Sequence, residues 1–373
     1  MSLYNYTIIP LCKKYNDINV FKYIILITIS INMDFSKYKD KGLTGLANLG
    51  NTCYLNSCIQ ILSHVYELDD ALTKINFEEK LNPVSDSILL VEWHKLYSLM
   101  WSENCTIAPH GFLRSIQKIA QVKHMEIFSG YAQNDLPEFL IFLVDAFHTS
   151  LMRKVDININ GTPKNKTDKL ATLCYKMIKD MYSKNYSEIL DLFYGISVTQ
   201  IVSLNGEVMS MNAEPFCILS LSIPNIRSPS IFDCLDLHCE NELMENDNAW
   251  FNEKTNEKES INKNTIFWSL PKILIIDIKR FNNNNRKIHK IISTPFTNVD
   301  FTGYIRGYHK ETFIYELFGV CNHSGGCQGG HYTAYVKNAN NKWYEFNDTN
   351  VREINEDKVV GDKSYCFFYR KIK

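Results

Sequence analysis

The chain has 373 residues, of which 45% are hydrophobic and 13% aromatic, so it can bury a substantial core and is too apolar for wholesale disorder. Its formal net charge of −1 argues against a protein that binds nucleic acid over its whole surface. The 11 cysteines are an odd number without a disulfide-like spacing, which favours free thiols. We therefore expect a reducing compartment, the cytoplasm or the nucleus.

The first forty residues are expected to be an extension, either disordered or produced by an upstream start site. The run from Tyr23 to Ile31 is apolar but well short of the roughly 20 residues that cross a bilayer. Lys13 and Lys14 precede this run, as in a signal peptide, but no small-residue cleavage site follows it. Met33 lies just before the domain, which we place at residues 41–373, and we expect no membrane association.

Helical periodicity dominates the first half of the chain. Apolar residues recur on one helical face in the stretches 52–65, 87–101, 135–147 and 173–181. Asn51 or Thr52 can cap the first of these helices, which leaves Cys53 in its first turn. At the start of the third, Asp135 and Glu138 resemble a capping box.

The second half is rich in short β-strand patterns. Strands are expected at 197–204, 207–211, 272–281, 317–321, 332–337, 342–346 and 365–370. Asn205 and Gly206, between the first two, suit a type I′ hairpin turn. The expected fold class is therefore α+β, with a cleft where the helical half meets the strands.

Cys53 is the candidate nucleophile. A lone cysteine is more often a small buried apolar residue. This one follows a Gly-Asn-Thr turn and enters a helix at its N-terminus, where the helix dipole should lower the pKa of the thiol. Free backbone N–H groups in that turn can face a developing oxyanion. Such a site still needs a base.

His331 is the candidate base, because the two glycines before it let its loop approach another segment closely. His323 is its rival in the same loop, whereas the other candidate histidines lie in helical stretches. The strand that ends at Asn347-Asp348 is expected to pair with the strand after His331. Either Asn347 or Asp348 could then orient the imidazole.

Together these residues resemble the ubiquitin-specific proteases, a family of papain-like cysteine proteases. The resemblance runs from about Gly42 to Arg370 and rests on ordered segments. They are 45–57 (GLANLGNTCYLNS), 128–140 (FSGYAQNDLPEFL), 270–281 (LPKILIIDIKRF), 315–335 around GGHYTAY, 343–348 (WYEFND) and 365–369 (YCFFY).

The resemblance implies hydrolysis of the bond after the C-terminal glycine of ubiquitin. Cys53 would be the nucleophile and His331 the base and then the acid. Asn347 would orient the imidazole, and Asp348 would assist or substitute for it. Asn48 would donate its side-chain amide to the oxyanion together with the Cys53 N–H. Removing one such donor typically lowers kcat by ~10²–10³.

The resemblance also implies a narrow channel for the basic, Gly-Gly-ended tail of ubiquitin. Gln133, Asp135, Glu138, Gly330 and Tyr332 would lie along it, and the glycines beside His331 would leave it too narrow for substrate side chains. Asp135 and Glu138 could instead serve only as helix caps, and both roles are compatible.

The family architecture implies a papain-like fold with a helical thumb at about 45–185, β fingers at about 190–265 and a palm mainly at 266–373. Where many members carry two C-x-x-C pairs for zinc, this chain has residues 201–204 (IVSL) and 252–255 (NEKT), so neither a metal nor another cofactor is expected. Cys234, His238 and Cys239 have no familiar ligand spacing. Cys327, near His331, is either a redox-sensitive thiol or an ordinary loop residue.

Three alternatives stay open at this point. A non-catalytic ubiquitin-binding protein is disfavoured, because no residue of the implied machinery is missing. The same chemistry on another Gly-Gly-ended modifier is compatible with every motif. A general peptide-cleaving cysteine protease fits the ordered segments poorly. The expected partners are ubiquitin or ubiquitinated proteins, with no nucleic acid, and the chain is expected to be monomeric.

Overall fold

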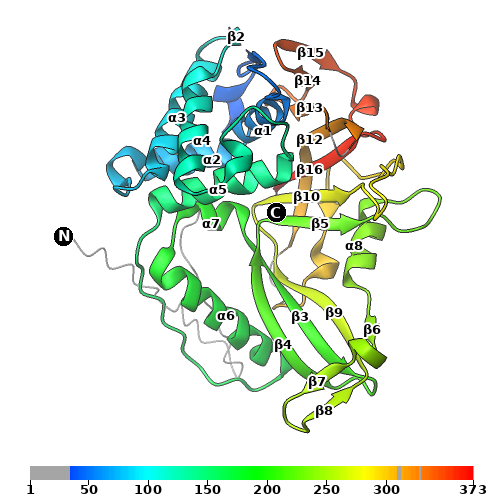
Figure 1. Cartoon of the computed structure of the whole chain (residues 1–373). Coiled ribbons are helices and arrows are strands. Elements are labelled where there is room, and N and C mark those ends of the chain that lie inside the picture. The colour runs from blue at the N-terminus through cyan, green and yellow to red at the C-terminus, as the bar shows by residue number, and fades with distance from the viewer. Residues whose placement is uncertain (1–33, 309–311, 327–328, 373) are drawn as a thin grey trace.

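The structure, a computed structural model, describes residues 34–308, 312–326 and 329–372. The apolar run at 23–31, Met33 and Cys327 lie outside the described residues, so the expectations about them stay predictions. Helices gather on one side of the upper part of Figure 1, a large sheet lies beside them, and long strands extend downward. The α+β class predicted from the sequence is confirmed.

Four of the helices in the described residues match the predicted stretches. These are α1 (Cys53–Ser63), α3 (Asp86–Ser102), α5 (Leu136–Leu151) and α6 (Lys166–Asn185). Four more were not predicted: α2 (Tyr66–Lys74), α4 (His110–Val122), α7 (Glu188–Phe193) and α8 (Ile231–Cys239). All residues of α1 are buried, because α5 packs on one side of it and strands β12 (Ile314–Gly326), β13 (Gly329–Lys337) and β14 (Trp343–Asn347) contact it as well. Cys53 therefore starts the central helix of the molecule.

The large sheet has the strand order β15-β14-β13-β12-β16-β10-β5, and β11 pairs with β12. The remaining strands are β5 (Ile218–Ser222), β10 (Ile273–Lys279), β11 (Val299–Asp300), β15 (Asn350–Ile354) and β16 (Ser364–Lys371). Along the main order only β10 and β5 run parallel. The predicted pairing of the His331 strand with the Asn347 strand is confirmed, with Ala334 opposite Phe346.

A second sheet forms the lower part of Figure 1. Its strands, in order, are β4 (Val208–Phe216), β3 (Gly195–Ser203), β9 (Ile261–Ser269) and β6 (Glu242–Met244). The predicted hairpin between β3 and β4 is confirmed, but its turn is not type I′. Gly206 has a φ of +82° while Asn205 does not enter the positive region, and the Gly206 N–H bonds to Ser203 O at 2.9 Å. This is a turn closed by a left-handed glycine, and the ladder beyond it has a bulge between Ile201 and Val202.

The tip of the second sheet carries the hairpin β7 (Trp250–Asn252) and β8 (Glu257–Glu259). Asn252 is buried and donates to Glu259 at 2.8 Å, and Thr255 donates to the same carboxylate oxygen at 2.8 Å. These hydrogen bonds thus stabilise residues 252–255, one of the two segments where many family members carry a C-x-x-C pair. In the residues that the structure describes, no group of three or more His, Cys, Asp or Glu side chains could hold a metal ion.

Two segments differ from the domain ranges expected from the sequence. β5 and α8 fall within 190–265, the range assigned to the fingers, yet β5 pairs with β10 in the large sheet and α8 packs on β5. Residues 34–40 were assigned to the extension, but Tyr38 stacks on Tyr66 with ring centroids 4.2 Å apart and donates to Asp69 at 2.6 Å. The packed domain therefore includes residues before 41.

A buried ion pair joins the last strand to the helical half. Arg370 Nε lies 2.5 Å from Glu67 Oε1, and the same guanidinium donates to His64 O at 2.7 Å. The guanidinium also lies over the Tyr66 ring, 4.7 Å from its centroid. Satisfying a buried charge on several sides offsets the cost of removing it from water.

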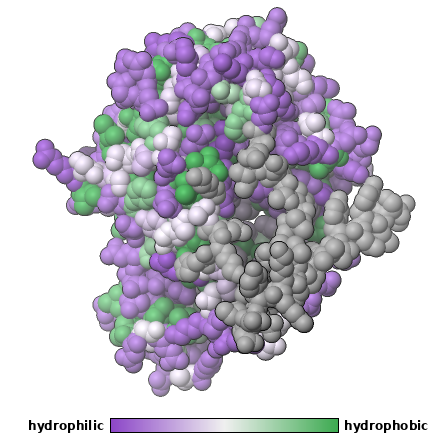
Figure 2. Space-filling model, turned by 180° about the vertical axis from the view of Figure 1, so that it is seen from behind, coloured by the Kyte–Doolittle hydropathy of each residue, from purple (hydrophilic) through white to green (hydrophobic). Residues whose placement is uncertain are grey.

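Hydrophilic side chains predominate where described residues are visible in Figure 2, and the apolar groups there are small. None of the helices in the described residues is long and apolar enough to cross a membrane.

Asp277, on β10 of the large sheet, gives a pH-dependent test of the fold. Burial raises the pKa of Asp277 to about 6, and Ser220 donates to its carboxylate at 2.8 Å. The ionised form is therefore disfavoured in the native state, so the penalty is absent below the ordinary value of 3.8 and fully present above about pH 6. We expect Asp277→Asn to raise the free energy of unfolding by up to about 3 kcal/mol at pH 8.

Urea unfolding of Asp277→Asn at pH 8 and pH 4 checks this. The gain should shrink to near zero at pH 4. Asp180→Asn, an exposed carboxylate on α6, is the matched control and should change little at either pH. An equal gain for Asp277→Asn at both pH values would contradict the assignment to ionisation.

Candidate active site

The turn that leads into α1 is held by the side chain of Asn48. Asn48 Oδ1 accepts the N–H groups of Gly50 and Thr52, each at 3.1 Å. Thr52 occupies the N-cap position, but neither predicted cap residue bonds a helix N–H, since the Thr52 hydroxyl accepts from Leu49 N at 2.9 Å. The first N–H groups of α1, beside Cys53, are therefore left free of side-chain caps.

The thiol of Cys53 is 2% exposed, and burial raises its pKa above the ordinary value. The charge of Asp348 raises the pKa further, whereas hydrogen bonding from the backbone of Tyr332, and then from Tyr54 and Cys53 at the start of α1, lowers it. The pKa is therefore raised overall, although a helix N-terminus was predicted to lower it. The effect has the expected sign, but the loss of hydration outweighs it.

His331 lies at the start of β13, and its Nε2 is 2.7 Å from Asn347 Oδ1 at the end of β14. An amide oxygen can only accept, so Nε2 carries the proton and Nδ1 is the ring nitrogen with a free lone pair. The next residue is Tyr332, whose backbone lowers the pKa of the Cys53 thiol. No hydrogen bond joins Cys53 to the His331 ring, both of which are described.

His323, the rival base, lies on β12 and faces another environment. Its ring packs on Tyr332 with centroids 4.6 Å apart. Burial, with a contribution from Lys287, lowers the pKa of His323 to about 4. Lys287 Nζ donates to His323 O at 2.5 Å and lies 3.1 Å from its Nδ1. His331, and not His323, bonds Asn347, one of the two residues that the pairing of the strands was predicted to place beside it.

The Asp348 carboxylate makes no hydrogen bond to the imidazole of His331, although both residues are among those described. Its carboxylate accepts from Asn48 Nδ2 at 3.1 Å and from Asn56 Nδ2 at 2.8 Å, and its carbonyl accepts from Leu46 N at 2.9 Å. Asp348 adopts the left-handed conformation, with φ at +51°, which costs a non-glycine residue about 1–2 kcal/mol. Of the two candidates, Asn347 bonds the imidazole, whereas the Asp348 carboxylate bonds Asn48 and Asn56.

The predicted tail channel brings Gln133 and Gly330 together. Gln133 Nε2 donates to Gly330 O, and Gln133 Oε1 accepts from Gly330 N, both at 2.7 Å. Gly330 is opposite Gly325 in the β12–β13 ladder, and the β14 pairing begins only at Ala334. The Gln133 amide therefore occupies the open edge of β13 where another strand could pair.

Position 330 has no room for a side chain, because a Cβ there would collide with His323 Nε2 and Ser324 O of β12. This close packing explains the glycine before His331.

Asp135 and Tyr332 form a second contact across the channel. The Tyr332 hydroxyl donates to Asp135 Oδ1 at 3.0 Å, and burial raises the pKa of Asp135. Asp135 is the N-cap residue of α5, but its side chain makes no cap hydrogen bond, so the predicted capping box is wrong. Glu138 is exposed in the first turn of α5, and in the described residues it bonds none of the other four predicted channel residues.

Two residues at the site were not identified from the sequence. Asn56, three residues after Cys53, is buried and bonds Asp348. Its spacing from Cys53 places both on one face of a helix, which was a usable signal. Lys287 reaches His323 from a loop near the end of β10, and nothing in the sequence pattern indicates that contact.

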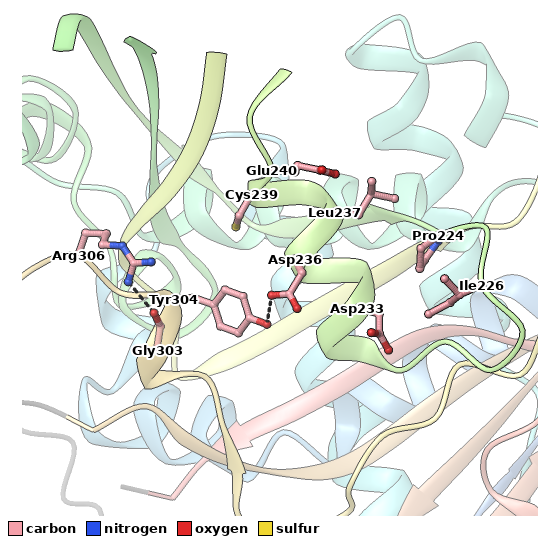
Figure 3. Close-up of a pocket in the computed structure, with 10 residues that line it drawn as sticks. All are labelled: Pro224, Ile226, Asp233, Asp236, Leu237, Cys239, Glu240, Gly303, Tyr304 and Arg306. Atoms are coloured by element: carbon pink, nitrogen blue, oxygen red, sulfur yellow. Dashed lines mark hydrogen bonds between the residues drawn. The ribbon is translucent and has the colours of Figure 1, made fainter. Parts of the chain in front are cut away.

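A pocket of about 750 Å³ lies elsewhere, beside α8. Figure 3 shows Asp236, Tyr304 and Arg306 among its lining residues, with the Tyr304 hydroxyl 2.7 Å from Asp236 Oδ1. It shares no residue with the predicted catalytic and channel residues.

The fold and the arrangement of Cys53, His331 and Asn347 define a papain-like cysteine protease. A family model described as ubiquitin carboxyl-terminal hydrolase matches residues 44–369, and the chain belongs to this family, as a ubiquitin-specific protease.

Several relatives match over most of this chain. Ubiquitin carboxyl-terminal hydrolase 2 of Gallus gallus is 31% identical over 347 residues, covering 88% of this chain and 93% of the relative. Usp2 of Drosophila melanogaster is 30% identical over 340 residues, covering 89% of this chain. A probable ubiquitin carboxyl-terminal hydrolase of Acanthamoeba polyphaga mimivirus is 25% identical over 438 residues, covering 92% and 93%. The chain spans 35% of the length of the Drosophila protein and 55% of the human hydrolase 2.

Solved structures show the same fold. The Ubp8-containing SAGA DUB module bound to monoubiquitin matches with a TM-score of 0.69 and 22% identity, covering 93% of this chain and 72% of that chain. A yeast SAGA DUB module matches with a TM-score of 0.69 and 23% identity, covering 91% and 70%.

The tautomer of His331 tests the geometry without any assay of activity. At a pH where the imidazole is neutral, we expect its proton on Nε2, because Asn347 Oδ1 accepts it. Asn347→Ala should give a mixture of tautomers, whereas Asp348→Asn should leave the Nε2–H form, since Asp348 bonds Asn48 and Asn56. Imidazole ¹⁵N shifts of histidine-labelled protein distinguish the forms, and the reverse pattern would overturn this arrangement.

Proposed function

We propose that this chain is a deubiquitinating cysteine protease, which hydrolyses the isopeptide or peptide bond after the C-terminal glycine of ubiquitin through a thioester. The observation that carries the proposal is the 2.7 Å contact of His331 Nε2 with Asn347 Oδ1, on strands packed against the helix that begins at Cys53. Membership of the family indicates the substrate class.

In the proposed reaction, His331 Nδ1 takes the proton of Cys53 as the sulfur attacks the carbonyl carbon of the terminal glycine. The C–N bond then breaks, and the leaving lysine amine takes the proton from His331. Water, deprotonated by His331, hydrolyses the thioester, which releases the ubiquitin carboxylate and restores the thiol. Because burial raises the pKa of Cys53, proton transfer accompanies attack instead of preceding it.

The developing oxyanion would be held by the Cys53 N–H and the side-chain amide of Asn48. Asn48 Oδ1 is bound by the turn, so its Nδ2 points away from that turn toward Asp348. One of the two hydrogen atoms on Nδ2 is donated to Asp348, and the second is available for the oxyanion. Asn347 orients His331 in this proposal, and Asp348 assists through Asn48.

The ubiquitin tail would pass between Gln133 and Gly330, beside Asp135 and Tyr332. An extended peptide that pairs with the open edge of β13 needs the N–H and C=O of Gly330, which Gln133 holds in the free protein. That the channel accepts only a glycine-ended tail is proposed on the strength of the family motif. Glu138 remains a proposed channel residue on the strength of the family motif alone.

We also infer a reducing compartment, the cytoplasm or the nucleus. The nine cysteines among the described residues are all free thiols, which supports this compartment. We further propose that the protein acts as a monomer.

Covalent capture tests the nucleophile and the modifier together. Ubiquitin with a C-terminal electrophile should form one adduct, at Cys53, and Cys53→Ala should lose the adduct and all turnover while still binding ubiquitin. Cys105, a partly exposed thiol, provides the matched control, because Cys105→Ala should keep both.

Parallel probes made from other ubiquitin-like modifiers complete this experiment. Adducts only with another modifier would keep the chemistry and change the substrate. The absence of any adduct from folded protein would favour a non-catalytic ubiquitin-binding protein, and turnover by Cys53→Ala would refute the assigned nucleophile.

Removing the Gln133 side chain should open the edge of β13. In a Cys53→Ala background, Gln133→Ala should raise the association rate of ubiquitin by up to about tenfold, because two hydrogen bonds of about 0.5–1.5 kcal/mol each no longer have to break. Stopped-flow binding measures this rate. Gln117→Ala, which removes a glutamine bonded to Gly130 O, is the control and should not change it. Slower association in Gln133→Ala would show that Gln133 helps to admit the tail.

A further inference from the structure

We propose that Asn56 is a positioning residue for the oxyanion: it holds the Asp348 carboxylate, which in turn fixes the side-chain amide of Asn48. The inference rests on the proposed function and adds a residue that the family motif did not single out. It concerns a buried side chain that does not itself reach the reacting atoms.

Asn56 is placed for this task by α1. It follows Cys53 by three residues, so both side chains lie on the same face of the helix. The Asn56 side chain is 2% exposed. Its Nδ2 donates to Asp348 Oδ1 at 2.8 Å, and it lies 3.3 Å from both Leu46 O and Ala47 O. One amide group thus connects the nucleophile helix, the turn after β14 and the segment that leads to Asn48.

Asp348 passes this constraint to Asn48. Its second carboxylate oxygen accepts from Asn48 Nδ2 at 3.1 Å, while Asn48 Oδ1 accepts the N–H groups of Gly50 and Thr52. The Asn48 amide is therefore held at both of its ends. Hydrogen bonds to an ionised group are roughly twice as strong as neutral ones, so a carboxylate suits this role.

The charge of Asp348 makes its orientation important. A carboxylate next to a developing oxyanion opposes catalysis unless donors hold its charge in a fixed direction. Asn48 and Asn56 are the two side chains in the described residues that donate to it. Losing the Asn56 donor leaves the carboxylate tied to the same amide that the oxyanion requires.

Asn56 has one unsatisfied polar atom. No group in the described residues hydrogen-bonds its Oδ1, although that atom is buried. Part of the hydrogen-bonding capacity of this buried amide is thus unmet, which costs stability whatever its role.

The same helix offers a matched control. Gln60, one turn further along α1, is 1% exposed, bonds Thr44 O through Nε2 at 2.7 Å, and likewise has a buried Oε1 that no described group bonds. Gln60 does not touch Asp348. Gln60→Ala therefore removes an equivalent buried amide without touching the path from Asn56 to Asn48.

The experiment compares Asn56→Ala with Gln60→Ala below the melting temperature of both. With a ubiquitin substrate, Asn56→Ala should lower kcat by about 10- to 100-fold with KM within about threefold, a loss smaller than that expected for deleting the donor itself. Alkylation of Cys53 by iodoacetamide, followed by mass spectrometry, needs the thiolate but no oxyanion and should stay within about twofold. Gln60→Ala should keep kcat while losing similar thermal stability.

Asn56→Asp adds a readout that a packing defect would not produce. Two adjacent carboxylates raise the pKa of one of them, and the protonated form can again donate to Asp348. The ratio of variant to wild-type kcat should therefore rise as the pH falls from 8 to 6. A constant ratio would argue against the bond to Asp348.

The outcomes separate this inference from the proposed function. If the wild-type chain hydrolyses no ubiquitin substrate, the proposed function fails. If it is active but Asn56→Ala matches Gln60→Ala in kcat, Asn56 has no positioning role. If alkylation of Cys53 falls in parallel with kcat, Asn56 supports the nucleophile and the oxyanion assignment is overturned.

Discussion

The site depends on how closely the turn after β14 is held against the segment that enters α1. Gly45 approaches the backbone of Thr349 so closely that a Cβ would collide with it, and Leu46 N bonds Asp348 O at 2.9 Å. This backbone contact brings the two halves of the chain together. Asn347 and Asp348 then point in different directions from one turn, the first to His331 and the second to Asn48. Asp348 adopts the left-handed backbone conformation in this turn, and that strain accompanies the different directions of the two side chains.

Burial sets the chemistry of the nucleophile more than the helix does. The N–H groups at the start of α1 lower the pKa of Cys53, but desolvation and the charge of Asp348 raise it more. A neutral thiol reacts less readily with oxidants than a thiolate does. It also needs a base to take its proton during attack. The protonation expected of His331, with Nδ1 unprotonated, suits that requirement. The same carboxylate that bonds Asn48 thus adds to the effect of burial in raising the pKa of the Cys53 thiol.

The parts of the fold predicted from the sequence are those with a local signal. The Asn347–His331 contact followed from the pairing of two strands, and α1, α3, α5 and α6 from helical periodicity. α4 carries a similar pattern, with Phe112, Ile116 and Ile119 buried, and could have been found. Other features depend on partners far along the chain: Asn56 meets Asp348 across 292 positions, and Gln133 meets Gly330 across 197. The local pattern of Asp135 and Glu138 indicated a helix cap. The bond of Asp135 to Tyr332 is equally remote in sequence, so the pattern could not indicate it.

The proposed tail contact and the proposed base are adjacent in one strand. Gly330, which Gln133 holds through both backbone groups, directly precedes His331. Tyr332, which bonds Asp135, directly follows it. Any ligand that replaces Gln133 at Gly330 exchanges the hydrogen-bond partners of the residue before His331. The imidazole stays anchored on its far side by Asn347. Three consecutive residues of β13 thus carry the contacts to Gln133, to Asn347 and to Asp135.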